Sequence, residues 1–287
     1  MPNIKCYEAG HPIPDANSYL ATQEALKLVS DLTQDDEVLF LISGGGSALF
    51  ESPLISEEEL QSITEKLLAS GADIVEMNTI RKRLSAVKGG RFALACAPAK
   101  VFSVVLSDII GDPLDMIASG PAYPDSSTCE QAFEIIENYK IPLSMEAKVF
   151  LKKETPKVLK NVETHITGSV KQLCESAQKE ALKLGYKAMY LSASLCCQAK
   201  EAGSFLASIA RDHQDTNDSL AFICGGETIV QLTGHGKGGR NQELALSAAQ
   251  GISGLEQTAV FSVGSDGTDG PTDAAGGYVE EILAQNY

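Results

Sequence analysis

The chain has 287 residues, and its 38 acidic residues outnumber 23 lysines and arginines, which gives a net charge of -15. With 44% apolar and 21% charged residues, the composition is that of a globular protein with one large domain or two ordinary ones. The negative charge argues against nonspecific nucleic-acid binding, and the sequence shows neither an apolar run of membrane length nor a signal-peptide pattern, so no nucleic-acid or membrane partner is expected.

Helical and strand patterns alternate along the chain. The predicted helices cover residues 17–32, 56–69, 71–85, 127–139, 170–184, 198–212 and 239–250. The predicted strands cover residues 37–42, 101–106, 162–167, 187–191, 220–224 and 258–263, with a further one at 228–233. Such alternation predicts an α/β fold with parallel sheets covered by helices.

A lysine-rich, irregular stretch from 151 to 160 interrupts this alternation. We place a domain boundary within it. Residues 1–155 then form a doubly wound, mostly parallel α/β domain, and residues 156–287 form a second, smaller α/β domain.

Seven cysteines are scattered along the chain, and none forms a CxxC pair. Their odd number and spacing indicate reduced thiols in a cytosol-like compartment. Cys196 and Cys197 could form a redox pair, but two adjacent buried small residues fit the pattern better.

In parallel sheets, ligands bind beyond the carboxyl ends of strands. Four loops after predicted strands share an unusual composition. The first is Ser43-Gly44-Gly45-Gly46-Ser47, whose bare backbone N–H groups and two hydroxyls suit an anion. A tight strand–helix turn is the alternative.

The second loop follows residues 101–106 and contains Asp108 and Asp112, flanked by glycine and proline. Two such carboxylates suit a Mg²⁺ ion held mostly by water and phosphate. Capping of the next element by either aspartate explains the pattern equally well.

The third loop begins at Gly225-Gly226-Glu227-Thr228 and runs to a predicted helix. Its glycines crowd around Lys237 and Arg240 just before that helix. Backbone donors, a helix N-terminus and two cations together suit a polyphosphate or a carboxylate.

The fourth loop carries Asp266, Asp269 and Asp273 after a predicted strand. Three aspartates at this spacing could hold a divalent cation, although the EF-hand order and its closing glutamate are absent. An Asx-rich turn is the alternative.

A fifth segment is helical and carries five cations in the eleven residues 81–91. Arg81, Ser85 and Lys88 share one helical face by their spacing. They form either a solvated face with ion pairs or an anion-binding wall.

Together these segments supply the groups that phosphoryl transfer needs. Most standard templates are absent, namely the P-loop, the protein-kinase set, the GxSxG elbow and HExxH. One GxGxxG occurs at Gly234, Gly236 and Gly239, but the next strand ends in Gly264 where a dinucleotide site has an acid.

Six stretches occur in an order typical of one family and span nearly the whole chain. They are GHPIPDANS, LISGGGSAL, NTIRKRLSAVKGGR, LSDIIGDPLDMIASGPAYPD, GGETIVQLTGHGKGGRNQELAL and VGSDGTDGPTDAAGG. In these blocks the sequence resembles the glycerate 2-kinase family, whose C-terminal part is often called the MOFRL domain. The middle segment from Ile166 to Ala193 resembles the animal members most.

The resemblance implies transfer of the ATP γ-phosphate to the 2-hydroxyl of D-glycerate with Mg²⁺, a reaction of serine and glycerate metabolism, in a cleft between two α/β domains. It implies that Arg240 is catalytic. The residues expected at substrate or phosphate are Ser43, Gly44, Gly45, Gly46, Ser47, Arg81, Ser85, Lys88, Lys237 and Asn241. The carboxylates expected near metal or substrate are Asp108, Asp112, Glu227, Asp266 and Asp269.

The chain departs from the family pattern in three places. Family members carry a preceding segment with a GxGK-type loop whose lysine is implied to be catalytic, whereas Met1 stands just before the GHPIPD block. They continue beyond TDAAGGYV, and they usually place asparagine where Val170 stands. We therefore expect a form truncated at both ends, with catalysis impaired by the missing lysine. A cytoplasmic location is expected, with the mitochondrion as the alternative. Assembly into a homo-oligomer is left as an open alternative to a monomer.

Two other functions compete with the kinase. One is an oxidoreductase acting on hydroxypyruvate, which needs a nicotinamide site at the glycines around Gly236. The other is a non-catalytic, truncated isoform that binds ligand or the full-length subunit.

Overall fold

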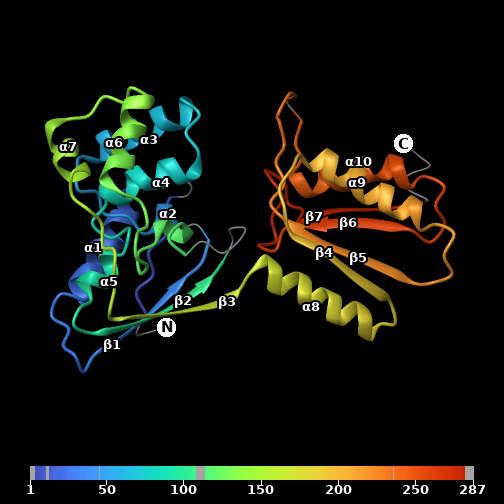
Figure 1. Cartoon of the computed structure of the whole chain (residues 1–287), viewed down its shortest axis with the longest axis horizontal. Helices are drawn as coiled ribbons and strands as arrows, with labels where there is room; N and C mark the ends of the chain where they lie inside the picture. The colour runs from blue at the N-terminus through green and yellow to red at the C-terminus, as the bar shows by residue number, and fades with distance from the viewer. Residues whose placement is uncertain (1–3, 11–12, 45, 108–113, 235, 282–287) are drawn as a thin grey trace. The chain divides into compact units, whose positions relative to one another are not determined.

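The computed structural model describes residues 4–10, 13–44, 46–107, 114–234 and 236–281. The chain divides into two compact units, Met1–Ser169 and Val170–Tyr287 (Figure 1). The sequence pattern placed this division after residue 155. The difference is due to strand β3 (Val162–Gly168), which pairs with β2 and so belongs to the first unit.

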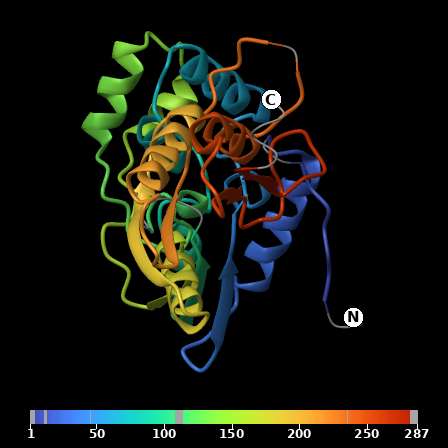
Figure 2. The same cartoon turned by 90° about the vertical axis from the view of Figure 1, so that its right-hand side faces the viewer.

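The sheet of the first unit is parallel, with the order β1 (Glu37–Ile42), β2 (Lys100–Leu106), β3. Helices α1 (Ala16–Leu28) and α5 (Arg91–Ala95) pack on one face of it, where the rings of Phe40 and Phe92 lie 4.7 Å apart. Figure 2 shows α1 running beside β1. On the opposite face, the alternate residues Leu39 and Leu41 are exposed.

A second layer of the first unit consists of helices around a separate apolar core. They are α3 (Glu57–Ala69), α4 (Ile74–Arg83), α6 (Cys129–Asn138) and α7 (Met145–Leu151). Each helix is preceded by a capping residue whose side chain accepts a backbone N–H of the first turn. These capping residues are Ser56, Asp73, Thr128 and Ser144. Two short elements, α2 (Gly46–Leu49) and the 3₁₀ turn η1 (Ile117–Ser119), lie in contact next to the sheet.

The second unit contains a parallel pair, β4 (Lys187–Leu195) with β5 (Leu220–Gly226), and an antiparallel pair, β6 (Ala259–Val263) with β7 (Gly276–Glu280). Helix α8 (Val170–Lys183) packs on the parallel pair. Helices α9 (Ala199–Asp212) and α10 (Arg240–Ile252) lie side by side, and α10 covers β6 and β7 (Figures 1 and 2).

Small residues allow α9 and α10 to approach closely. Any Cβ at Gly203 would overlap the Leu244 carbonyl oxygen, and Ala207 and Ala248 are fully buried at the same contact. This packing holds α10, and with it the loop that leads into its first residue.

The α/β class with parallel sheets is confirmed, and most predicted elements are present. The strand predicted at 228–233 is absent: in that segment Ile229 forms an isolated bridge with Gln198. Elements that were not predicted, such as α2, α5 and β7, span four or five residues, too few to show a period. No helix in the described ranges is long and apolar enough to cross a membrane, and all seven cysteines are free.

Candidate functional site

The glycine-rich loop after β1 is in close contact with another part of the protein. Ser43 and Gly44 are exposed, Gly45 lies outside the described residues, and Gly46 begins α2. A Cβ at Gly46 would stand 2.7 Å from the Cβ of Ala118, closer than real Cβ atoms come. The protein itself therefore requires a glycine at this position, because η1 packs against it.

The segment that contacts Gly46 has an unusual backbone. Ala118 and Ser119 have φ angles of 51° and 61°, and Gly120 continues with 63°. Left-handed conformations are costly for residues with a Cβ and concentrate at functional sites. Gly89 and Gly90 stabilise the segment by donating their N–H groups to the carbonyls of Ser119 and Gly120, at 3.0 and 2.7 Å.

A chain of side-chain hydrogen bonds links this segment to the glycine-rich loop. The Ser119 hydroxyl donates to Asn78 Oδ1 at 2.8 Å, and it lies 3.1 Å from the Ser47 hydroxyl. Because a serine has one hydroxyl proton, Ser47 is the donor to Ser119. The Ser47 oxygen then offers lone pairs to a ligand, whereas the sequence analysis expected a donor.

The cations predicted to form an anion-binding wall also act on this loop. Arg81 and Lys88 both donate to the carbonyl of Ser47, at 3.0 and 2.8 Å, and Lys88 also donates to Phe50 O at 3.1 Å. Lys88 and Ser85 are fully buried, while Arg81 is half-buried. Lys88 is thus placed to support the loop, whereas the Ser85 hydroxyl accepts the N–H of Val87 at 3.4 Å. Direct ligand binding by these three residues stays a prediction.

Lys88 also faces a buried carboxylate. Its Nζ lies 3.5 Å from Glu51 Oε2, and neither side chain is exposed. Burial lowers the pKa of Lys88 to about 8, against the attraction of Glu51, which raises it. The ammonium is therefore costly to keep charged and depends on its contacts with the loop.

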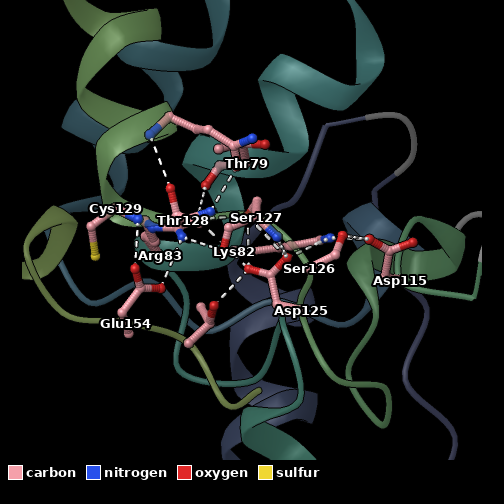
Figure 3. Close-up of polar contacts among 12 residues, drawn as sticks. Thr79, Lys82, Arg83, Asp115, Asp125, Ser126, Ser127, Thr128, Cys129 and Glu154 are labelled. Carbon is pink, nitrogen blue, oxygen red and sulfur yellow. Dashed lines mark hydrogen bonds and ion pairs between the residues drawn. The ribbon is translucent and has the colours of Figure 1, made fainter. Parts of the chain in front are cut away.

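A second buried charge cluster lies in the first unit and was not predicted from the sequence (Figure 3). Lys82 Nζ lies 3.1 Å from Asp125 and 3.2 Å from Asp115, and Arg83 donates to Ser127 at 2.8 Å. Burial raises the pKa of Asp125, but hydrogen bonds from Thr155 and the charge of Lys82 outweigh it, so the net pKa is lowered. The signal was present in the cations at 81–83, because three consecutive helical residues cannot all face solvent.

In the second unit, the start of α10 is capped by a side chain from a different loop. The carboxylate of Asp269 accepts the N–H groups of Asn241 and Gln242, at 3.0 and 2.9 Å, and both of their side-chain amides, at 3.1 and 3.0 Å. The N-terminus predicted to receive an external anion is therefore occupied by Asp269. The amide oxygen of Asn241 accepts from Ser262, so both ends of that side chain are engaged.

Arg240, the first residue of α10, has an exposed side chain. Its guanidinium forms an ion pair with Glu227 and donates to the carbonyl of Thr228 at 3.2 Å. Lys237, on the same loop, is exposed as well. The structure thus brings together Arg240 and Glu227, which the sequence analysis assigned to catalysis and to metal binding.

The predicted metal ligands do not gather into a cation site within the described residues. Asp108 and Asp112 lie outside those residues, Glu227 is paired with Arg240, and the Asp269 carboxylate is fully engaged. Asp266 is exposed and accepts from the backbone and hydroxyl of Thr268 in its own turn. Across the described ranges, no group of three His, Cys, Asp or Glu side chains is arranged to hold a metal ion.

Comparisons with known proteins identify the family. A model described as a domain of unknown function, DUF4147, matches residues 1–152, and the MOFRL family model matches residues 220–287. The chain is 53% identical over 289 residues to the D-glycerate 2-kinase of Thermotoga maritima, covering 99% of this chain and 69% of that protein. The chain belongs to the glycerate 2-kinase family. This confirms the resemblance drawn from the six sequence blocks.

Other members of the glycerate 2-kinase family agree. The glycerate 2-kinase of Pyrococcus horikoshii is 43% identical over 297 residues, covering 98% of this chain and 67% of that protein. A crystal structure of the glycerate kinase from Thermotoga maritima superposes with a TM-score of 0.93 at 52% identity, over 98% of this chain and 69% of that one. The fold described above is therefore the fold of this family.

Proposed function

We propose that the protein is a kinase that transfers the γ-phosphate of ATP to the 2-hydroxyl of D-glycerate. The observation that carries this proposal is the 53% identity to a D-glycerate 2-kinase over 99% of the chain. The site residues agree with it, because cations and backbone donors at strand ends are what phosphoryl transfer requires of a protein.

In this proposal Arg240 acts on the transferring phosphoryl group. Its guanidinium is exposed on the first residue of a capped helix, with Lys237 three residues earlier on the same loop. Planar guanidinium groups bind phosphate oxygens with two hydrogen bonds and stabilise the charge that develops on them. When ATP binds, we expect Arg240 to exchange Glu227 for phosphate oxygens.

The loop Ser43–Ser47 is proposed to bind glycerate in the first unit. Ser43 and Gly44 expose their backbone after β1, which suits a carboxylate. The Ser47 oxygen, whose proton is engaged by Ser119, is suited to accept a hydrogen bond from a substrate hydroxyl.

Magnesium is proposed to arrive with ATP, bound mainly by phosphate oxygens and water, as this ion usually is. The described carboxylates do not form a cage for it, so we assign no catalytic step to a protein-bound ion. We also propose a cytoplasmic, reducing location, in agreement with the seven free cysteines, with the mitochondrial matrix as the alternative.

The test is formation of 2-phosphoglycerate from ATP, Mg²⁺ and D-glycerate, read by ³¹P NMR so that slow turnover is also measured. Arg240→Ala is expected to lower kcat by about 10³-fold, the lower end of what a transition-state arginine contributes. The matched control is Arg211→Ala, an exposed arginine of the second unit at the end of α9, which should behave as the wild type.

Unchanged turnover by Arg240→Ala would contradict the assigned role. Oxidation of NADH with hydroxypyruvate, independent of ATP, would contradict the kinase and favour the oxidoreductase. Light scattering on the same preparation measures whether the protein is a homo-oligomer.

A further inference from the structure

Asp269 is a buried carboxylate to which the proposed mechanism gives no part. Its side chain is 2% exposed, and its four hydrogen bonds all come from two consecutive residues, Asn241 and Gln242. Burial raises its pKa, but these donors outweigh burial and keep the pKa of Asp269 below its ordinary value. The group is therefore a stable anion at neutral pH, fixed at the start of α10.

Two glycines allow the loops to meet around this carboxylate. A Cβ at Gly239 would overlap the Asp269 carboxylate, and a Cβ at Gly270, whose φ is 61°, would overlap the carbonyl of Gly238. The loop before α10 and the loop after β6 are thus in direct backbone contact. Their contact is specific, because larger residues at either glycine would separate them.

Arg240 lies in the middle of this contact. The residue before it is Gly239, against the carboxylate, and the two residues after it donate four hydrogen bonds to the same group. Asn241 is also held by Ser262 of β6, and Gln242 by Thr272 at 2.9 Å. The backbone of Arg240 is therefore fixed on both sides, while its side chain stays exposed.

We propose that Asp269 is the positioning residue for Arg240, and that its carboxylate sets the place from which the guanidinium meets the phosphoryl group. This inference rests on the proposed kinase function. Asp269, which the sequence pattern predicted to be a metal ligand, thereby has a positioning role.

The alternative is that Asp269 is a helix cap and nothing more. A cap satisfies the first N–H groups of a helix and adds stability. Positioning requires in addition that the loop 264–273 stays joined to the start of α10. The two roles can be distinguished by a variant in which another side chain caps α10 and the contact with Asp269 is absent.

The chain offers such a replacement. Gly239 is the residue at the N-cap of α10, with extended φ and ψ of -137° and 172° that any residue adopts. In an Asp269→Ala background, the carboxylate that would overlap a Cβ at Gly239 is gone. Gly239→Ser then places a hydroxyl where it can accept the N–H groups of Asn241 and Gln242, the same donors that Asp269 binds.

The experiment compares Asp269→Ala, the double variant Gly239→Ser/Asp269→Ala, and Asp215→Ala, an exposed aspartate of the same unit, as control. For each we measure kcat and KM for 2-phosphoglycerate formation, the melting temperature, and hydrogen exchange at residues 240–243. Asp269→Ala is expected to lower kcat by about 10²-fold, the cost of a small misplacement of a reacting group, with a far smaller change in KM. Its melting temperature falls and exchange at residues 240–243 accelerates, while Asp215→Ala matches the wild type.

The double variant decides between the two roles. We expect it to recover the melting temperature and the slow exchange, and to keep the low kcat. Recovery of kcat together with stability would show that Asp269 is a cap alone, and wild-type kcat in Asp269→Ala would overturn the inference outright. If the wild type itself forms no 2-phosphoglycerate, the proposed function fails and this inference fails with it. If the enzyme is active and depends on Arg240 but not on Asp269, only this inference fails.

Discussion

Two glycine-rich loops, one in each unit, are held by buried charges of opposite sign. At the loop after β1, the cations Lys88 and Arg81 bind the carbonyl of Ser47. At the loop before α10, the anion Asp269 binds the N–H groups of the first helical residues. Each charge matches the end of the backbone dipole that it contacts, carbonyls in one case and N–H groups in the other.

The difference shows which groups remain for a ligand. After β1, the cations are used on the protein's own carbonyls, so the groups that remain are the exposed Ser43 and Gly44 and the half-buried Ser47 hydroxyl. Before α10, the carboxylate is used on the N–H groups, so the exposed groups are the cations Lys237 and Arg240. Whether a charged residue at a glycine-rich loop is available to a ligand therefore depends on its burial: the buried charges bind the protein's own backbone, and the exposed ones remain for a ligand.

The largest expected effect tests whether buried charges hold the first unit together. Asp125 is 1% exposed and faces Lys82 and Arg83, which are fully buried. Asp125→Ala removes the buried carboxylate that the two cations share and leaves them only the more exposed Asp115 and Glu154. We therefore expect a loss of about 3–5 kcal/mol in the free energy of unfolding, measured in urea. Hydrogen exchange should show the loss of protection in residues 1–169.

The control for this variant is Asp35→Ala, an exposed aspartate of the same unit, which should change stability little. Loss of protection spread equally over residues 170–287 would contradict the division into two units. A small effect of Asp125→Ala would mean that the cluster does not determine the stability of this unit.

The second prediction concerns pH and the cation behind the glycine loop. The pKa of Lys88 is about 8 in the folded protein, because burial disfavours its charge, against 10.5 for an ordinary lysine. Between these two values the unfolded chain binds the extra proton, so the contribution of Lys88 to the free energy of unfolding rises with pH, by about 3 kcal/mol in all. Below pH 8 both states are protonated and this contribution is flat.

Urea unfolding of the wild type and of Lys88→Met across pH 7–10.5 measures this effect as the difference between two slopes. Lys171→Met, on the exposed face of α8, is the matched control and should keep the wild-type slope. If Lys88→Met also keeps that slope, burial does not lower the pKa of Lys88. The loop after β1 would then not be held by a buried cation, as the comparison between the two loops requires.

The sequence predicted the architecture better than the contacts of the site. Alternating helical and strand patterns predicted the parallel strands. The four loops that follow predicted strands include the segments that carry the exposed Arg240 and the glycine-rich turn after β1. Local pattern is sufficient for these features, since period and turn composition are properties of consecutive residues.

The partners of the buried charges were beyond local pattern. Lys82 and Asp125 lie 43 positions apart, and Asn241 and Asp269 lie 28 positions apart. Which carboxylate meets which cation depends on how elements pack, and burial reverses the meaning of a charge from solvated surface group to internal support. For the same reason, the sequence assigned Asp269 to metal and Lys88 to an anion, whereas each is engaged with the backbone or side chains of its own unit.

The smallest expected effect tests the close contact at Gly46. Gly46→Ala places a Cβ 2.7 Å from the Cβ of Ala118, so either α2 or η1 has to shift, at a cost of about 1–3 kcal/mol. Ala118→Gly removes the opposing atom and also relieves a left-handed alanine, which costs about 1 kcal/mol in this conformation. The double variant should therefore be more stable than Gly46→Ala alone, and a double-mutant cycle in urea measures the coupling.

Ala177→Gly in the interior of α8 is the control for the added glycine, and it should destabilise by about 1 kcal/mol, the ordinary cost in a helix. If Ala118→Gly fails to rescue Gly46→Ala, the glycine is not required by η1. The bare backbone at Gly46 would then have to be explained by a ligand, and the two glycine-rich loops would differ in more than the sign of the charge that holds them.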